Sequence, residues 1–275
     1  PLGDVDSDGF IDYGVTALSP SGGVVTVYSG WSGVPLRVHS GPTGAAEFGN
    51  AVCALGDVNG DGHDDIAIAS WMADFGPAGF SQDAGCVSIY SGLDGSVLVD
   101  GSLKAELQGD DEGDRFGAAM VSLGDNGGER WFAVSAVDDD DRGSSSGSVR
   151  ILSIASDLTL TRHEDLYGNS AGDRFGTSLA ACDVNNGTTA ELIVGAPLVD
   201  TTGGVNAGRV YLYELENDTY GQPVALFSGE AAGDNFGCSV AGLGSWSGEP
   251  MGVIVVGADS TDGGGVSSGS VHVFS

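Results

Sequence analysis

Residues 48–70 read FGNAVCALGDVNGDGHDDIAIAS, and this stretch contains the basic pattern of the chain. It opens on a Phe-Gly pair and a short apolar run, passes through a loop rich in Asp and Gly, and ends on a second apolar run. Short apolar runs bounded by Gly and Asp are typical of β-strands. The stretch therefore predicts two strands joined by a polar hairpin loop.

The same elements recur along the whole chain. The Phe-Gly run returns as FGAAMVSLGD from Phe116, FGTSLAACD from Phe175 and FGCSVAGLG from Phe236. The run after the loop returns as WFAVSA from Trp131, LIVGAP from Leu192 and VIVVGA from Val253. A third run follows a glycine each time: GGVVTVYSG from Gly22, GCVSIYSG from Gly85, GSVRILS from Gly147, GRVYLYE from Gly208 and GSVHVFS from Gly269. A weaker fourth run reads PLRVHSG (35–41), LKAELQG (103–109), EDLYG (164–168) and PVALFSG (223–229).

Four short strands that repeat about every 60 residues are typical of the blades of a β-propeller. We predict an all-β propeller of four-stranded antiparallel blades that forms a single domain over residues 1–275. Its repeats span approximately residues 1–46, 47–114, 115–174, 175–234 and 235–275, of which the first and last are incomplete. Because an incomplete sheet leaves an open edge, we expect the missing strands of a larger propeller to come from further sequence or from another chain. A five-bladed ring closed by its own ends and a two-sheet sandwich are the alternatives.

Two glycine positions carry conformational predictions. The glycine before each third strand suits a tight turn with positive φ. The Phe-Gly pair suits a first strand whose ring packs between blades, while its glycine permits close approach of the backbone.

The composition excludes several classes of protein. The formal net charge is −30, with 39 acidic residues against 9 basic ones, so phosphate backbones and anionic membranes would be repelled. No apolar run is long enough to span a bilayer. The 48 glycines argue against long helices. The chain starts at Pro1 without a leader, so we expect a mature product or a part of something longer.

The cysteines do not form a zinc motif. Cys53, Cys86, Cys182 and Cys238 include no CxxC pair and lie within or beside apolar runs. We expect them to be small buried apolar residues.

Two Asp-rich loops share one spacing of oxygen ligands. In DVDSDGFID (4–12) and DVNGDGHDD (57–65), side-chain oxygens fall at loop positions 1, 3, 5 and 9, with glycine at position 6. The predicted side-chain ligands are Asp4, Asp6, Asp8 and Asp12 in the first loop and Asp57, Asn59, Asp61 and Asp65 in the second. Position 7, which is Phe10 or His63, is predicted to offer its carbonyl. Six to eight hard oxygen ligands favour Ca²⁺ over Zn²⁺, with Mg²⁺ as a weaker rival and a solvated turn as the plain alternative.

The other loops between first and second strands are less complete. DVNNGTTAE (183–191) keeps Asp183, Asn185 and Glu191 but has Gly187 at position 5, so its metal binding is left open. GDNGGERW (124–131) and GSWSGEP (244–250) lack the spacing and are predicted to be plain hairpin loops.

Together these phrases resemble the FG-GAP repeats found in the β-propeller of integrin α subunits. The resemblance rests on four Phe-Gly pairs (48–49, 116–117, 175–176 and 236–237), on the two Asp-rich loops, and on VGAP at 194–197. It implies a propeller, usually of seven blades, with calcium in the hairpin between the first and second strands of a blade. It also implies an extracellular location and roles in adhesion or partner binding.

The loops opposite the predicted calcium face are candidate binding surfaces for a protein or glycan. GDDEGDRFG (109–117) and DDDDRGSSSG (138–147) are acidic, which is compatible with a cationic partner, a further metal or a solvated charge run. SWMADFGPAGFSQDAG (70–85) carries Trp71, Met72, Phe75 and Phe80, either as interface anchors or folded over their own blade. Asn186 and Asn217 begin N-glycosylation sequons.

We therefore expect an extracellular, calcium-binding and non-catalytic module for adhesion or for protein or glycan binding. The alternative is a structural building block of a cell-surface or filament assembly, in which a neighbouring subunit completes the propeller. A secreted hydrolase is the least supported alternative, because no nucleophile motif is present and most acidic residues are explained by loops and turns.

Overall fold

The computed structural model describes residues 1–19, 22–41, 45–74, 82–185, 189–216, 218–243, 252–261 and 268–275. Within these ranges the chain forms β-strands and two short 3₁₀ turns, without an α-helix. No helix in the described part is both long and apolar enough to cross a membrane.

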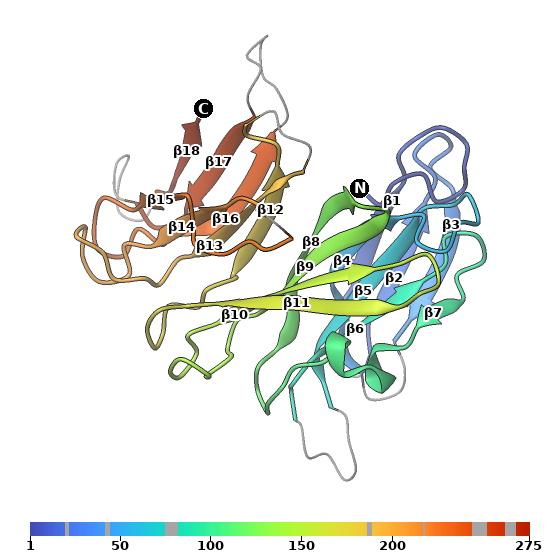
Figure 1. Cartoon of the computed structure of the whole chain (residues 1–275), viewed down its shortest axis with the longest axis horizontal. Helices are drawn as coiled ribbons and strands as arrows, with labels where there is room; N and C mark the ends of the chain where they lie inside the picture. The colour runs from blue at the N-terminus through green and yellow to red at the C-terminus, as the bar shows by residue number, and fades with distance from the viewer. Residues whose placement is uncertain are drawn as a thin grey trace. The chain divides into compact units, whose positions relative to one another are not determined.

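The strands form five antiparallel sheets that follow one another along the chain (Figure 1). The first contains β1 (Tyr13–Ala17), β2 (Val24–Tyr28) and β3 (Pro35–Ser40). The second contains β4 (Ala45–Gly56), β5 (Asp65–Ala73), β6 (Cys86–Tyr90) and β7 (Val97–Val99). The third contains β8 (Phe116–Asn126), β9 (Glu129–Ala136), β10 (Ser148–Ile154) and β11 (Leu160–Tyr167). The fourth contains β12 (Ser178–Cys182), β13 (Glu191–Ala196), β14 (Arg209–Tyr213) and β15 (Ala225–Ser228), and the fifth β16 (Phe236–Leu243), β17 (Val253–Ala258) and β18 (Ser270–Phe274).

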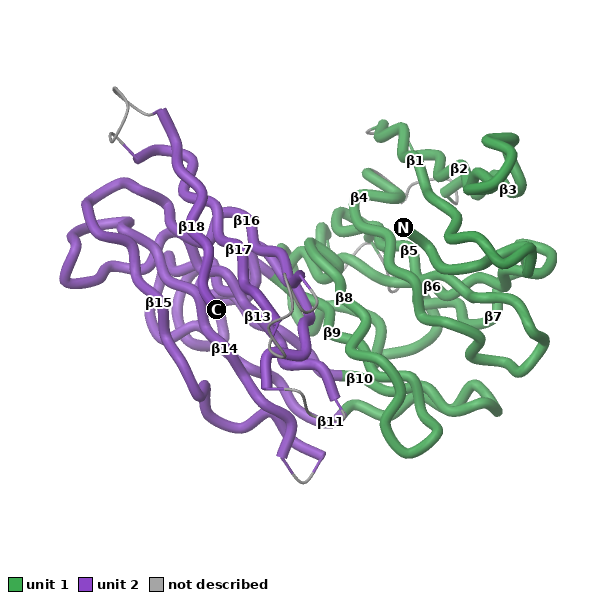
Figure 2. Tube along the Cα trace, turned by 90° about the horizontal axis from the view of Figure 1, so that it is seen from above, with its two compact units in different colours: residues 1–136, 152–162 green, residues 137–151, 163–275 purple. Residues whose placement is uncertain are grey.

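This strand order confirms the predicted propeller blades. Three sheets have four strands each, and the first and last sheets have three. The chain divides into two compact units, one of residues 1–136 with 152–162 and one of residues 137–151 with 163–275 (Figure 2). The repeat boundaries given above, and their assembly into one domain, stay predictions.

The fourth strand of the second sheet was predicted at the wrong place. Among residues 103–109, Gln108 alone pairs with β6, in an isolated β-bridge to Cys86. Val97–Val99 forms the strand instead, and two 3₁₀ turns follow, η1 (Gly101–Leu103) and η2 (Ala105–Leu107). The Asp100 side chain caps η1 by accepting a hydrogen bond from the Ser102 amide at 2.9 Å. This local cap competes with strand pairing, which explains the misplacement.

The Phe-Gly pairs behave as predicted. Their four phenylalanines are at most 2% exposed, and the following glycines all have φ between 85° and 94°. Phe116 belongs to the core cluster that also contains Val87 of the preceding sheet. A Cβ on Gly117 would lie 2.7 Å from the Ala69 Cβ, so only glycine lets these two sheets approach so closely.

The glycine directly before the third strand adopts the predicted conformation in four of the five sheets. Gly85, Gly147, Gly208 and Gly269 have φ between 73° and 87°. In the first sheet Gly23 directly precedes β2 without a positive φ, and Gly22, one residue earlier, has a φ of 130°. This region is accessible to glycine at low cost, which accounts for its repeated use at this turn.

Four free thiols accompany this fold. Cys53 and Cys182 are buried, whereas Cys86 and Cys238 are half-buried. Burial raises the pKa of Cys53 to about 12 and that of Cys86 to about 11. The expectation of buried thiols therefore holds fully for two of the four.

Candidate functional site

The two Asp-rich loops occupy equivalent places in neighbouring repeats. Residues 57–65 join β4 to β5, which is the predicted hairpin between first and second strands. Residues 4–12 lead into β1, and a β-bridge between Gly3 and Asp12 closes their base. Both loops lie in the first compact unit.

The first loop is shaped by its own carboxylates. The Asp4 carboxylate accepts hydrogen bonds from the amides of Asp8 at 2.9 Å and Gly9 at 2.8 Å. The Asp8 carboxylate accepts from the Phe10 amide at 2.9 Å. Gly9 has a φ of 89°, which allows the chain to reverse at position 6. The loop therefore holds its acidic side chains on one side of a tight turn.

The carboxylates of Asp4, Asp6 and Asp8 form a close cluster. Each offers a carboxylate oxygen that lies within 4.8 Å of the others. Two oxygens bound to one Ca²⁺ at about 2.4 Å are separated by at most about 4.8 Å, so this cluster fits such an ion. Burial, followed by the charges of Asp12 and Asp8, raises the pKa of the Asp6 carboxyl. A cation at this point would oppose that repulsion.

The second loop repeats the turn with one change. The Asp57 carboxylate accepts hydrogen bonds from the amides of Gly60 at 2.7 Å and Gly62 at 2.9 Å, and Asp61 accepts from the His63 amide at 3.0 Å. Asn59 takes the place of Asp6, and its amide donates to the Asp61 carboxylate at 2.9 Å. The second loop therefore keeps a side-chain oxygen at each of these positions, and the neutral Asn59 reduces its charge repulsion.

Comparison with known proteins identifies the repeat. The sequence model described as "FG-GAP repeat" matches residues 48–90 and 175–213, which contain the second loop and the third. The chain carries FG-GAP repeats of the integrin α type. It is similar to Integrin alpha-V of Gallus gallus, with 34% identity over 214 residues that cover 73% of this chain and 20% of that protein. It is also similar to Integrin alpha-11 of Homo sapiens, with 28% identity over 131 residues, 47% of this chain and 11% of that protein. The chain therefore spans a fifth or less of the length of these relatives.

The position 9 acids of these FG-GAP loops have a structural role that the ligand spacing did not predict. Asp12 and Asp65 are fully buried, and Glu191 is 2% exposed. Asp65 accepts hydrogen bonds from the amides of Val58 and Gly92, each at 2.9 Å. Gly92 lies in the loop between β6 and β7. The Asp65 carboxylate therefore connects the loop between the first and second strands to the loop between the third and fourth strands.

Asp12 repeats both of these bonds in the first loop, and Glu191 repeats the bond within its own loop. Asp12 accepts from the amides of Val5 and Gly30 at 2.8 Å, and Glu191 accepts from the Val184 amide at 2.6 Å. Burial raises the pKa of the Glu191 carboxyl. All three position 9 acids therefore anchor the backbone, and their assignment as metal ligands stays a prediction.

The two complete FG-GAP loops also contact each other. The Asp64 carboxylate accepts a hydrogen bond from the Asp4 amide at 2.8 Å, and the Asp64 amide donates to the Asp4 carbonyl at 3.2 Å. The His63 Nδ1 atom lies 2.9 Å from the Val5 carbonyl oxygen and 3.2 Å from the Ser7 hydroxyl. Phe10, the other position 7 residue, packs its exposed ring against Trp31, with centroids 4.8 Å apart.

The third loop is described only in part, because residues 186–188, which include Asn186 and Gly187, lie outside the described ranges. The Asn185 amide donates to the Glu214 carboxylate at 3.1 Å. The charge of Asp183 is among the causes that raise the pKa of the Glu191 carboxyl, after burial. Metal binding by Asp183, Asn185 and Glu191 stays a prediction.

Three acids of the two acidic runs, 109–117 and 138–147, contact other side chains of their own compact unit. Asp110 pairs with Arg162 at 2.9 Å, and Asp138 pairs with Arg174 at 3.4 Å. Asp139 is buried and accepts from the Ser148 hydroxyl at 2.6 Å. The two runs belong to different compact units.

The remaining candidate features are only partly described. Trp71 and Met72 belong to β5 and are half-buried, and the Arg115 guanidinium lies 5.3 Å from the centre of the Trp71 ring. Phe75, Phe80 and Asn217 lie outside the described residues.

Proposed function

We propose that this chain is a calcium-stabilised, extracellular and non-catalytic propeller module that binds a protein or glycan ligand. The cluster formed by Asp4, Asp6 and Asp8 is the observation that supports the proposal most strongly. The integrin α relatives support the cell-surface setting and the adhesive role.

The proposed ligands follow the loop positions. In the first loop, Asp4, Asp6 and Asp8 hold the ion with the Phe10 carbonyl. In the second, the corresponding groups are Asp57, Asn59, Asp61 and the His63 carbonyl. Asp12, Asp65 and the partial set in the third loop are further proposed ligands. When bound, Ca²⁺ supplies positive charge that offsets carboxylate repulsion, and its role is structural.

The loops at the opposite end of the strands are the proposed binding surface. They include the turns before the third strands and the connections that lead into each Phe-Gly pair. The metal loops and these loops lie at opposite ends of the same strands, because neighbouring strands are antiparallel. In the blades that carry these Asp-rich loops, calcium therefore stabilises one end of the strands, and the ligand binds at the other end.

The alternative function is a building block of a larger assembly, and the fifth sheet favours it. Val271 and Val273 of β18 are 70% and 66% exposed, although their counterparts Val210 and Leu212 in β14 are buried. A neighbouring chain that covers this face of the fifth sheet would bury Val271 and Val273, as their counterparts are buried in the fourth sheet. Light scattering distinguishes the two functions, because a building block forms defined polymers and a binding module remains a discrete species.

Thermal unfolding in EDTA and across a calcium titration tests the main proposal. We expect calcium to raise the Tm by mass action, because the ion binds only the folded loops. The Asp8→Ala and Asp61→Ala double variant should lose that rise. An unchanged Tm in calcium would reject the metal assignment.

A further inference from the structure

His39 of β3 is buried where the first sheet packs against the second. The residue is 5% exposed, and its ring lies edge-on to the Tyr90 ring of β6, with centroids 4.8 Å apart. The Phe48 ring of β4 meets the same Tyr90 ring edge-on at 6.2 Å. Together these three rings form the first ring cluster, which joins the two sheets within the first compact unit.

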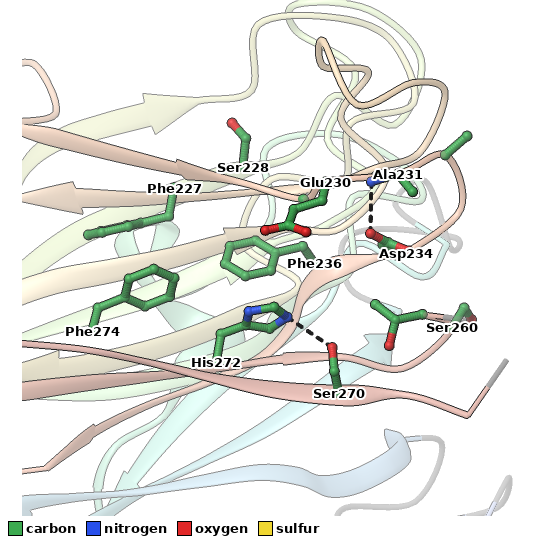
Figure 3. Close-up of a pocket in the computed structure, with 13 residues that line it drawn as sticks. Phe227, Ser228, Glu230, Ala231, Asp234, Phe236, Ser260, Ser270, His272 and Phe274 are labelled. Carbon is green, nitrogen blue, oxygen red and sulfur yellow. Dashed lines mark hydrogen bonds between the residues drawn. The ribbon is translucent and has the colours of Figure 1, made fainter. Parts of the chain in front are cut away.

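The contact between the fourth and fifth sheets contains the same arrangement with a phenylalanine in place of the histidine. Phe227, Phe236 and Phe274 form this second ring cluster (Figure 3). Phe227 and Phe274 have centroids 4.5 Å apart, and Phe236 lies edge-on to Phe274 at 6.1 Å. These distances are close to those of the first ring cluster, so the two clusters are equivalent ring for ring.

The strand register also places His39 and Phe227 at equivalent positions. His39 pairs with Val25, and Phe227 pairs with Val210. Each of these valines stands two residues after the last glycine before a third strand. The imidazole of His39 therefore occupies a place that holds an apolar ring in another repeat.

The buried imidazole lacks a partner for one of its nitrogens. The Nε2 atom of His39 makes no hydrogen bond within the described part of the chain. The loop between β6 and β7 covers the ring, because a Cβ added to Gly95 would lie 3.4 Å from the His39 Cε1 atom. A protonated imidazole donates from both nitrogens. Protonation would therefore leave a buried N–H donor without an acceptor, which is costly.

The positive charge beside His39 also opposes protonation. Arg37 lies two residues earlier on β3, and its guanidinium donates hydrogen bonds to the carbonyls of Leu36, at 2.9 Å, and Leu93. A Cβ added to Gly95 would lie 3.4 Å from the Arg37 Cδ atom as well, so the same loop covers both side chains. Burial, followed by the charge of Arg37, lowers the pKa of His39.

The acids on the elements around this contact do not offset a charge on His39. Asp94 is exposed in the loop between β6 and β7, where hydrogen bonds from Ser96 lower its pKa first and the charge of Arg37 contributes less. Glu47 lies in β4, directly before the phenylalanine of the first ring cluster. Neither acid acts on the pKa of His39 in the described structure.

The titratable groups of β6 and of the segment after β7 act on Tyr90. Burial, followed by Cys86 and the exposed Asp100, raises the pKa of Tyr90 to about 12, so its hydroxyl is neutral at physiological pH. Among the charged groups of the described chain, Arg37 is the one that acts on the pKa of His39. A proton on His39 therefore has a like charge beside it and no carboxylate to balance it.

We propose that His39 makes the contact between the first and second sheets sensitive to acid. Below about pH 6.5, where an ordinary histidine gains its proton, protonation places an unbalanced charge in the first ring cluster and loosens the packing of the two sheets. The second ring cluster lacks this response, because Phe227 does not titrate. This acid response is a property of the fold and goes beyond the proposed binding function.

The sign of the effect follows from proton binding. The unfolded chain binds the His39 proton more readily than the folded chain does. The stabilising contribution of the neutral ring is therefore complete above about pH 6.5, and it is lost as the pH falls below that value.

Urea denaturation in EDTA, at about pH 7.5 and about pH 5.5, tests the proposal without involving calcium. The unchanged chain is compared with His39→Phe, which carries the residue of the equivalent position. We expect the ratio of their unfolding equilibrium constants, unchanged chain over variant, to rise by about tenfold on acidification, because the unfolded state alone gains the proton. A ratio that stays the same or falls would overturn the proposal.

His272→Phe is the matched control for this measurement. His272 belongs to β18, is half-buried and has the Ser270 hydroxyl 2.9 Å from its Nε2 atom. Because this ring is partly exposed and its nitrogen has a partner, His272→Phe should respond to acid as the unchanged chain does. An equal loss of the acid response in His272→Phe and His39→Phe would contradict the assignment to His39.

NMR of the unchanged chain gives a test that does not depend on the folding of a variant. The His39 ring signals should report a pKa below the ordinary histidine value of about 6.5. Amide hydrogen exchange in β3, corrected for the intrinsic rate, should accelerate on acidification relative to exchange in β15. A His39 ring that titrates at or above the ordinary value, or an equal loss of protection in β3 and β15, would overturn the proposal.

Discussion

The Asp64 carboxylate accepts a hydrogen bond from the backbone amide of Asp4 at 2.8 Å. This bond joins the second Asp-rich loop to the first residue of the first loop. Asp64 occupies position 8 of its own loop and is not a predicted ligand. It is therefore placed to orient the first loop from outside.

Replacement of Asp64 should weaken calcium binding by the first loop. Groups that orient metal ligands typically contribute about tenfold or more to affinity, so we expect Asp64→Ala to weaken that site by about tenfold. Asp64→Asn retains an oxygen acceptor and should have a smaller effect. Calorimetric titration measures the change, with Glu112→Ala as the exposed control. Identical losses for Asn and Ala would assign the effect to charge instead of the hydrogen bond.

Asp65 should stabilise the fold even without metal. Its carboxylate is fully buried and accepts from two backbone amides, so Asp65→Ala leaves buried donors without a partner. We expect a loss of about 2 kcal/mol or more in the free energy of unfolding, measured by urea denaturation in EDTA. Exposed Asp61 is the matched comparison, and Asp61→Ala should change that free energy by less than about 0.5 kcal/mol in EDTA. Equal losses for the two variants would contradict the anchoring role.

Gly117 should tolerate no side chain. Gly117→Ala combines a φ of 94° with a Cβ placed 2.7 Å from the Ala69 Cβ. Gly128 has a similar φ of 88°, but a Cβ added there would have no neighbour within 4 Å. We expect Gly128→Ala to cost about 1 kcal/mol in unfolding free energy and Gly117→Ala clearly more, since it adds a clash between sheets. Urea denaturation measures both losses of unfolding free energy. Similar losses for the two variants would show that backbone strain alone accounts for the glycine at position 117.

These glycines also show how much the sequence could predict. The Phe-Gly pair and the glycine before the third strand recur with the same neighbours, so their packing and their φ angles follow from the repeat itself. Competition between a side-chain cap and strand pairing was harder to predict. The Asp100 cap, which favours 3₁₀ turns over a strand in residues 101–107, occurs in only one repeat of the described chain.

The roles of Asp64 and Asp65 depend on contacts that no local pattern contains. Asp65 bonds to Gly92, which is 27 residues away, and Asp64 bonds to Asp4, which is 60 residues away. Spacing within a nine-residue loop predicts Asp65 as a ligand, which stays a prediction, but it gives no information on these hydrogen-bond partners. The recurrence of an acid at position 9 in the otherwise incomplete third loop, as Glu191, was the available signal for a structural role.

The buried thiol of Cys53 should make stability depend on alkaline pH. Its pKa is raised from 9.0 to about 12 in the folded chain by burial. The folded state therefore retains the proton longer than the unfolded state does, so this stabilising contribution is complete below pH 9 and is lost between pH 9 and 12. The slope approaches about 1.4 kcal/mol per pH unit within that window. Urea denaturation should show that the difference in unfolding free energy between the unchanged chain and Cys53→Ala becomes smaller as the pH rises through that range. A difference that stays constant with pH would contradict the prediction.

Calcium titration by calorimetry tests the central claim most directly, with the unchanged chain beside the single variants Asp8→Ala and Asp61→Ala. We predict that the unchanged chain binds Ca²⁺ and that each variant binds one ion fewer, because each removes a position 5 ligand from one loop. Retention of full stoichiometry by both variants, or no calcium binding by the folded unchanged chain, would contradict the account.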